Sequence, residues 1–206
     1  VVATGVTPRV PEIPGIGHPK VIAYPDLLAG RKAAGRRVAV IGAGGIGVDV
    51  CTFLVMPQAM SSAAWCDEWG VDVTGREPGG LAPASPPASP REVWLLQRKP
   101  GARRMGAGPG RTTGWAHRIA LRRAGVTMLA GVEYRRIDDA GLHIRIGDDE
   151  RCLGVDSIVV CAGQESSRAL AVRDDARIHV IGGARRAGEL DAEAAIRDGA
   201  ELASRL

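Results

Sequence analysis

The clearest pattern in the chain is a short apolar run that breaks into closely spaced glycines and then resumes at helical spacing. Residues Val38–Ile41 are all apolar, as is typical of a strand buried on both faces of a parallel sheet. Beyond the glycines, apolar side chains recur at three- and four-residue steps until Pro57 ends the pattern. These positions are Ile46, Val50, Phe53 and Leu54. The pattern predicts a strand, a glycine turn and a helix in that order.

Further apolar runs extend this unit into a Rossmann-like α/β domain. We expect strands at 92–96, 126–129 and 157–161, and a helix from Thr112 or Thr113 to Ala124, with Gly125 as the C-cap signal. Alternating stretches at 132–137, 142–146 and 151–153, separated by Asp/Gly turns, predict an antiparallel β-meander. The predicted fold class is therefore α/β, with a parallel sheet and a β-meander crossover.

The two ends of the chain carry weaker patterns. Val1–Gly5 and 177–183 each predict a short strand ending in small residues, and a helix is expected to begin near Glu189. Prolines mark residues 6–11 as a connector, and a short strand and a helical turn are expected within 21–30. The stretch 57–90 is predicted to be an irregular insertion ending in a stiff surface loop.

The glycine turn favours a dinucleotide site. Gly42 permits a tight turn, Gly44 lets the backbone approach a pyrophosphate, and Gly47 lets helix and strand pack closely. The helix N-terminus offers unpaired amides and a partial positive charge, which favour an anion. The alternative is a purely structural glycine turn.

The residues after the second parallel strand indicate which nucleotide is bound. A site specific for NAD usually carries Asp or Glu there, to accept hydrogen bonds from the ribose hydroxyls. This chain instead has Gln97, Arg98 and Lys99, and two cations suit a 2′-phosphate. We therefore predict NADP(H) over NAD(H). The alternative is that Arg98 and Lys99 are solvated loop charges.

Composition excludes several classes. The 206 residues have a net charge of +4 with acidic residues interleaved, so a nucleic-acid surface is disfavoured. The four cysteines show neither a CxxC pair nor metal-ligand spacing, which fits reduced thiols in a cytoplasmic protein. No metal ligand and no catalytic side chain is expected, and His117 is interpreted as a surface or packing residue. There is no membrane-spanning run or signal peptide, and the start at Val1 inside an apparent strand indicates a fragment.

Several longer motifs resemble the C-terminal part of bacterial NADPH-dependent 2,4-dienoyl-CoA reductases, flavoproteins of the old-yellow-enzyme and trimethylamine-dehydrogenase group. The resemblance covers the whole chain. Its motifs are 2–9 (VATGVTPR), 42–47 (GAGGIG), 67–70 (DEWG), 79–81 (GGL), 96–99 (LQRK), 112–118 (TTGWAHR) and 161–165 (CAGQE).

The resemblance implies an NADPH domain held between two pieces of an FAD domain. Residues 1–25 would leave the FAD domain, 26–165 would form the NADP(H) domain with its insertion at 57–90, and 166–206 would return to the incomplete FAD domain. In this family NADPH reduces FAD, and electrons pass through a 4Fe-4S cluster to FMN in a barrel that reduces the acyl-CoA in fatty acid β-oxidation. The FMN barrel, the iron–sulfur cluster and the rest of the FAD domain are expected as partners in the same polypeptide. This chain alone would therefore lack the substrate-reducing site.

The resemblance also assigns cofactor-binding residues. Gly42, Gly44, Gly45 and Gly47 would line the NADPH pyrophosphate, and Arg98 and Lys99 the 2′-phosphate. Arg111 stands where relatives often have Lys. The residues implied near the flavin and its domain junction are Ala3, Thr4, Gly5, Ala162, Gly163, Gly182, Gly183, Leu190 and Asp191. Many related flavoproteins have an Asp after the glycine of the last turn, where this chain has Gly183-Ala184.

Two alternatives stay open. The chain could belong to a relative that acts on another enoate or enone, or to an amine dehydrogenase, because the substrate site lies outside this sequence. It could also be a nucleotide-binding module without catalysis.

Overall fold

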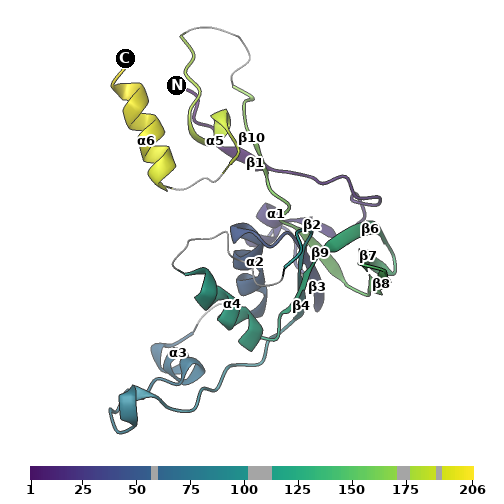
Figure 1. The fold of residues 1–206 in the computed structure, drawn as a ribbon, viewed down its shortest axis with the longest axis vertical. Coiled ribbons are helices and arrows are strands. Elements are labelled where there is room, and N and C mark those ends of the chain that lie inside the picture. The colour runs from purple at the N-terminus through teal and green to yellow at the C-terminus, as the bar shows by residue number, and fades with distance from the viewer. Residues whose placement is uncertain (57–59, 102–112, 171–176, 189–191) are drawn as a thin grey trace. The chain divides into compact units, whose positions relative to one another are not determined.

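The computed structural model describes residues 1–56, 60–101, 113–170, 177–188 and 192–206, which form two compact units (Figure 1). One unit comprises Pro11–Cys161, and the other combines Val1–Val10 with Ala162–Leu206. We call these the central unit and the split unit. None of the described helices is long and apolar enough to cross a bilayer.

The central unit is built on a five-stranded parallel sheet in the order β2-β9-β3-β4-β5. Its strands are β2 (Val21–Ala23), β3 (Arg37–Ile41), β4 (Glu92–Gln97), β5 (Thr127–Ala130) and β9 (Ser157–Val160). In the middle of the sheet, Val40 lies opposite Leu95 on one side and Val159 on the other. The predicted Rossmann-like sheet is thereby confirmed.

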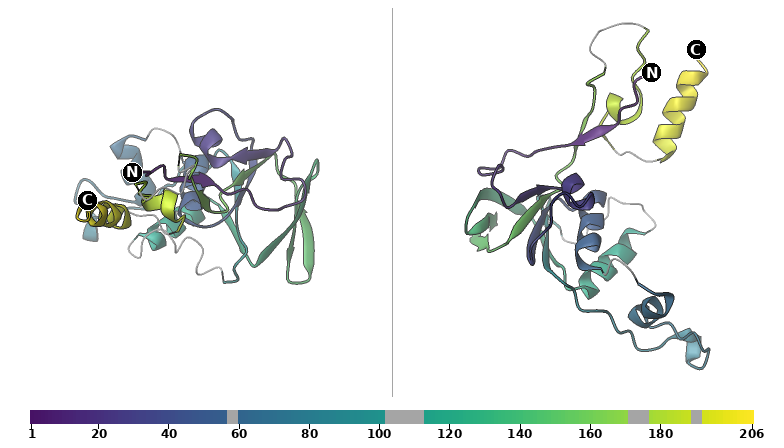
Figure 2. Two further views of the ribbon diagram at one scale, coloured as in Figure 1. Left: turned by 90° about the horizontal axis from the view of Figure 1, so that it is seen from above. Right: turned by 180° about the vertical axis from the view of Figure 1, so that it is seen from behind.

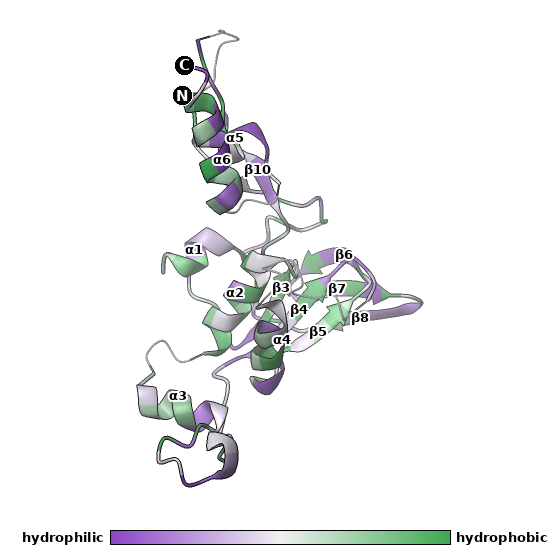
Figure 3. Ribbon diagram, turned by 60° about the vertical axis from the view of Figure 1, so that its left-hand side comes forward, coloured by the Kyte–Doolittle hydropathy of each residue, from purple (hydrophilic) through white to green (hydrophobic). Residues whose placement is uncertain are grey.

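Three helices and a second sheet cover the two faces of this parallel sheet (Figure 2). The helices are α1 (Tyr24–Leu28), α2 (Gly45–Val55) and α4 (Gly114–Arg123), and α2 packs against β3 and β4. Val38, Val40 and Leu95 join the core on the helical side, whereas the alternate residues Ile41 and Leu96 are buried on the other face. Figure 3 shows the apolar character of these strands. Burial on both faces explains why the strands have continuous apolar runs.

The second sheet is the predicted meander. It consists of β6 (Val132–Asp138), β7 (Gly141–Ile146) and β8 (Asp149–Leu153), paired antiparallel in that order. Its inner face contributes buried apolar side chains, namely Val132, Ile137, Leu142, Ile144 and Leu153. Leu142, for example, is fully buried.

The insertion contains more regular structure than the sequence predicted. Helix α3 (Ser62–Trp69) is followed by a 3-10 turn, η1 (Pro78–Gly80). The Ser61 hydroxyl accepts a hydrogen bond from the Ala64 amide at 3.1 Å, and Gly70 ends the helix in the left-handed conformation. The expectation of an irregular segment was therefore wrong over 62–69, because these two caps define a helix whose apolar pattern is weak.

The split unit has few strand pairs. Strands β1 (Val6–Pro8) and β10 (Gln164–Ser166) pair antiparallel, so part of the expected connector at 6–11 is a strand. The strands predicted at Val1–Gly5 and 177–181 reduce to a single parallel bridge between Val2 and Val180. A strand needs hydrogen-bonded neighbours to persist. Helices α5 (Gly182–Arg185) and α6 (Ala192–Ala203) complete this unit.

The boundaries of the units differ from those inferred from the resemblance. Residues 11–25 lie in the central unit because β2 pairs with β9, and 162–165 lie in the split unit because β10 pairs with β1. The compact units are divided after residues 10 and 161, and the domain boundaries near 25 and 165 stay predictions. The assignment of the two units to NADP(H) and FAD stays a proposal.

Candidate functional site

The glycine turn lies at the carboxyl end of β3, where the parallel sheet meets the start of α2. Gly42 has a φ of +109°, a conformation that favours glycine, and its amide donates to the Leu96 carbonyl of β4 at 2.9 Å. This bond ties the turn to the neighbouring strand. The turn is therefore fixed at the edge where ligands of open α/β sheets bind.

Gly47 has a structural role in this turn. A Cβ atom at Gly47 would lie 1.8 Å from the Gly42 carbonyl oxygen and 3.6 Å from Leu95 Cδ1. No side chain fits at the first distance, so the close approach of α2 to the turn requires glycine.

Gly44 differs from Gly47, because the packing of the described chain would leave room for a side chain at Gly44. Its φ is −78°, and a Cβ there would meet nothing within 4 Å among the described residues. Gly44 is exposed and is the N-cap of α2, where it offers no side chain to the helix amides. The open space and the uncapped helix start fit an anionic group approaching the backbone. Gly45 is the first residue of α2 and shares this position.

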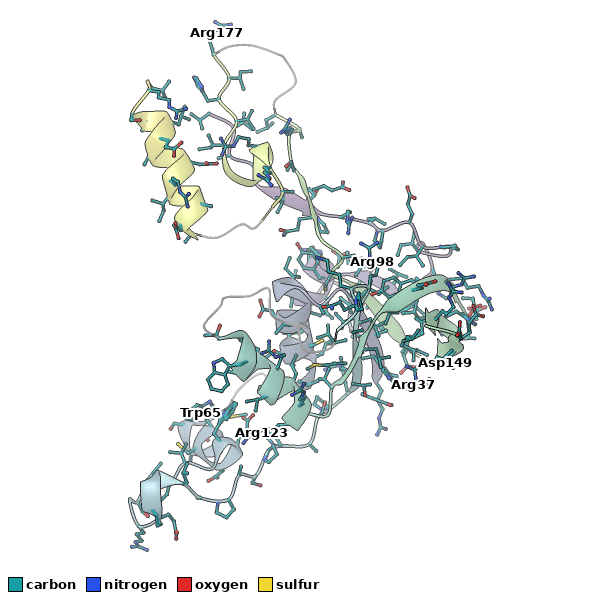
Figure 4. The ribbon with its side chains drawn as sticks, in the orientation of Figure 1. Arg37, Trp65, Arg98, Arg123, Asp149 and Arg177 are labelled. Carbon is teal, nitrogen blue, oxygen red and sulfur yellow. The ribbon has the colours of Figure 1, made fainter. Side chains whose placement is uncertain are left out.

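Arg98 and Lys99 follow β4 at the same edge of the sheet. In the parallel pairing of β3 with β4, Ile41 lies opposite Leu96. The residues that follow these two strands are therefore neighbours at one edge of the sheet. Both cations are exposed, and the last residue of β4 is Gln97 rather than a carboxylate. Figure 4 shows Arg98 close to β6. The structure therefore brings the predicted pyrophosphate and 2′-phosphate residues to one edge.

Arg111 and His117 are two further central-unit residues that the sequence singled out. Arg111 lies outside the described residues. His117 is half-buried within α4, a helix that packs against α2, and its backbone amide bonds to the Thr113 carbonyl at 3.2 Å. Its assignment as a packing or surface residue stays a prediction.

The split unit brings together several of the residues predicted near FAD. The Thr4 hydroxyl donates to the Ser167 carbonyl at 2.6 Å, and the Ser167 amide donates to the Gly5 carbonyl at 3.0 Å. A Cβ at Gly183 would lie 2.9 Å from Val6 Cγ1 and 3.1 Å from the Gly5 carbonyl carbon. The small residues of these two remote segments are therefore needed for their own close packing. Ala3 is exposed beside them, and Leu190 and Asp191 lie outside the described residues.

A carboxylate that the sequence did not point to lies at the last glycine turn. Asp198 of α6 accepts a hydrogen bond from the Gly182 amide at 2.9 Å and forms an ion pair with Arg185 at 2.6 Å. The sequence showed that an Asp is missing after Gly182, but it gave no signal that α6 supplies a carboxylate at that turn. The Gly182 amide is thus already satisfied within the chain. A pocket of about 270 Å³ adjoins this turn, lined in part by His179, Asp198 and Arg205.

Ala162 and Gly163 are held by an arginine that was also missed. The Arg9 guanidinium donates to the Ala162 carbonyl, with Nε at 2.9 Å and Nη2 as a second donor, and the Arg9 amide donates to the Gly163 carbonyl at 3.0 Å. Gly163 has a φ of +104°, so this turn favours glycine. Arg9 therefore links the two segments of the split unit.

All four cysteines are described, and each is a free thiol. Burial raises the pKa of Cys51 well above its usual value and that of Cys161 to about 12. A thiol with a raised pKa is a poor nucleophile. Among the described residues, no group of three or more His, Cys, Asp or Glu side chains is placed to hold a metal ion.

Comparison with known proteins identifies the family of this chain. The pyridine nucleotide-disulphide oxidoreductase family model matches residues 1–193. A metal reductase of Desulforamulus reducens (strain ATCC BAA-1160 / DSM 100696 / MI-1) is 25% identical over 184 residues, which cover 82% of this chain and 25% of that protein. The chain thus spans about a quarter of the length of this curated relative.

Solved structures share the fold at low identity. A 2-naphthoyl-CoA reductase in complex with 2-naphthoyl-CoA matches with a TM-score of 0.72 and 20% identity, over 99% of this chain and 26% of that one. The 6-hydroxypseudooxynicotine amine oxidase of Pseudomonas geniculata N1 matches with a TM-score of 0.68 and 19% identity, over 97% of this chain and 28% of that one. Histamine dehydrogenase from Rhizobium sp. 4-9 matches with a TM-score of 0.66 and 15% identity, over 99% of this chain and 30% of that one. On the family match, the chain belongs to the pyridine nucleotide-disulphide oxidoreductases, a family of flavin-dependent oxidoreductases that use a pyridine nucleotide.

Proposed function

We propose that the central unit binds NADPH and is the electron-entry part of a flavin-dependent reductase, with FAD as the hydride acceptor. The proposal rests on the groups that lie together at the carboxyl edge of the parallel sheet. An uncapped eleven-residue helix starts beside Gly44, whose missing side chain leaves open space, and Arg98 and Lys99 lie at the same edge. This arrangement offers backbone amides to one phosphate group and two side-chain cations to another.

The residues present fit the cofactor that the family implies. Gly42, Gly44, Gly45 and Gly47 would hold the pyrophosphate through the backbone and the helix dipole, and Arg98 and Lys99 would hold the 2′-phosphate. Arg111 is assigned to the phosphates on the resemblance alone. When bound, NADPH supplies the hydride, and the residues of this chain bind and orient it.

The fit to FAD is less complete. Ala3, Thr4, Gly5, Ala162, Gly163, Gly182 and Gly183 supply small residues at turns, and the resemblance adds Leu190 and Asp191. However, the Gly182 amide is already bonded to Asp198, and the Ala162 carbonyl to Arg9. We propose that these positions approach FAD through their backbone, without a carboxylate after Gly182.

The remaining FAD domain of a longer polypeptide is proposed as the partner of the split unit. Among its described apolar residues, only Ala184 is buried, whereas Val1, Leu170 and Ile196 are about 70% exposed. Helix α6 is amphipathic, as its two colours in Figure 3 indicate, yet no described α6 residue is buried. Additional polypeptide would cover these apolar side chains and pair with the strand edge at Val2.

The substrate class is proposed from the sequence motifs. We propose a 2,4-dienoyl-CoA reductase, acting in fatty acid β-oxidation in the cytoplasm, with FMN and a 4Fe-4S cluster in the rest of the polypeptide. A structural neighbour that is a naphthoyl-CoA reductase agrees with a CoA-thioester substrate. An amine dehydrogenase is the second candidate, because two further neighbours are an amine oxidase and a histamine dehydrogenase. Assaying the longer protein with a dienoyl-CoA and with amines separates the two.

A titration of the chain with NADPH and with NADH tests the nucleotide proposal directly. We expect tighter binding of NADPH, and Arg98→Ala or Lys99→Ala should each remove about 1.5–3 kcal/mol of that preference, or roughly tenfold or more in Kd. Arg122→Ala, an exposed arginine in the last turn of α4, is the control for charge removal in general. Equal binding of the two nucleotides would refute the proposal.

A further inference from the structure

The loop that carries Arg98 and Lys99 is held by a side chain of its own strand. Gln97 is the last residue of β4, and its side-chain amide donates from Nε2 to the Lys99 carbonyl oxygen at 2.8 Å. This bond closes the backbone on itself across Arg98. The two cationic residues therefore lie within a turn whose shape depends on Gln97.

A second donor reaches the same carbonyl from another part of the sheet. The Gly131 amide, in the turn between β5 and β6, donates to the Lys99 carbonyl at 3.2 Å. Gly131 has a φ of +72°, which glycine adopts without strain. The Lys99 carbonyl is thus held from two sides, by its own strand and by the adjacent turn.

The surroundings leave both cations available to a ligand. Within the described part of the chain, neither Arg98 nor Lys99 forms an ion pair with a carboxylate. The half-buried phenol of Tyr134 on β6 lies near Arg98. Burial raises the pKa of Tyr134, and the positive charge of Arg98 acts in the opposite direction. A neutral phenol beside Arg98 does not neutralise its charge.

We propose that Gln97 is a positioning residue that determines specificity for the 2′-phosphate. It does so by fixing the backbone from which Arg98 and Lys99 extend. Binding costs conformational entropy, because the backbone and the long cationic side chains become ordered. A backbone that is already fixed before binding reduces this entropic cost. This inference rests on the proposed NADPH function and adds to it the residue that organises the selective loop.

The test is a Gln97→Met variant of the chain, which keeps the side-chain length and removes the donor. We expect the Kd for NADPH to rise about three- to tenfold, the effect of one neutral hydrogen bond, and the Kd for NADH to change less than about twofold. In the background of Arg98→Ala with Lys99→Ala, Gln97→Met should no longer change the ratio of the two affinities. A residue that only stabilised the fold would lower both affinities together.

The matched control is at the opposite end of β4. The Ser89 hydroxyl donates to the Arg91 carbonyl at 2.6 Å and accepts from the Arg91 amide at 3.2 Å, so Ser89→Ala removes side-chain-to-backbone bonds away from the ligand edge. We expect it to leave the NADPH-to-NADH ratio unchanged. Circular dichroism verifies folding of each variant, and Gln97→Asn, whose shorter amide does not reach the Lys99 carbonyl, replaces Gln97→Met if that protein unfolds.

The outcomes separate this inference from the function on which it rests. If the wild-type chain shows no NADPH preference, the proposed function fails and the inference with it. If the wild type prefers NADPH and Gln97→Met keeps that preference, only the role of Gln97 is refuted. An additive effect in the background without the two cations would also overturn it.

Discussion

The Cα atom of Gly47 lies so close to the Gly42 carbonyl that a Cβ on Gly47 would sit 1.8 Å from that oxygen. Helix α2 therefore approaches the preceding turn through two glycines of the fingerprint. The third, Gly44, has open space around it. Gly47 is thus required for packing within the chain, whereas Gly44 leaves space beside the backbone. Substitutions at the two positions can separate these roles.

Gly47→Ala should destabilise the chain although alanine favours helices. The added Cβ would meet backbone atoms, so α2 must shift, at a cost of about 1–3 kcal/mol. Gly44→Ala, at the N-cap, should cost less than about 1 kcal/mol in stability but should weaken NADPH binding. Urea unfolding and nucleotide titration of both variants check this pair. Equal losses of stability would contradict the assignment.

Asp72 should make the insertion sensitive to acid. Its carboxylate accepts hydrogen bonds from the Thr74 hydroxyl and from the Glu77, Thr74 and Arg76 amides, and these lower its pKa from the usual 3.8 to about 2. A lowered folded-state pKa stabilises the fold fully above pH 3.8, and this contribution is lost as the pH falls toward 2.

The measurement is the Tm of wild type and Asp72→Asn as a function of pH. We expect the variant to melt lower at pH 7, and the difference to shrink below pH 3.8 and disappear as the pH falls through about 2. Asp67→Asn, an exposed carboxylate on α3, is the control for charge removal within the insertion. A difference that stays constant with pH would contradict the role of the Asp72 carboxylate.

Arg123, the last residue of α4, should hold the α3 part of the insertion against that helix. Its guanidinium lies 4.9 Å from the centre of the Trp69 ring, and the ring centres of Trp69 and Trp65 are 6.3 Å apart. Arg123 and Trp65 are labelled in Figure 4. Arg123→Met should cost about 0.5–1 kcal/mol. It should also increase amide exchange over α3, measured by hydrogen–deuterium exchange. Arg122→Met, next to it on α4, is the control, and equal effects of both changes would argue against the contact with Trp69.

The cysteines should differ in reactivity with alkylating reagents. Cys152 is exposed, whereas Cys51 and Cys161 are buried with raised pKa values. With iodoacetamide at pH 8, mass spectrometry should show rapid modification of Cys152. Cys51 and Cys161 should be modified only after denaturant is added, because the thiolate is the reactive form. Early modification of Cys161 in the folded chain would show that the end of β9 opens to solvent.

Local patterns predicted the central unit well. A parallel strand buried on both faces needs a continuous apolar run, and a helix packed on one face needs three- and four-residue spacing, so β3, β4, β9 and α2 could be located from the sequence. The caps of α3 were also present as Ser61 and Gly70, but prolines and glycines around them favoured an irregular segment.

The sequence by itself determined the elements whose physical cause is local: the apolar runs, the glycine turn, and the two cations that follow β4. The tertiary structure alone decided which distant groups meet. Asp198 reaches the Gly182 amide, Arg9 reaches the Ala162 carbonyl, and the Gly131 amide reaches Lys99, across separations that no periodicity records. Hydrogen bonds between remote segments depend on how the chain packs, because donor and acceptor must come within about 3 Å in a defined direction.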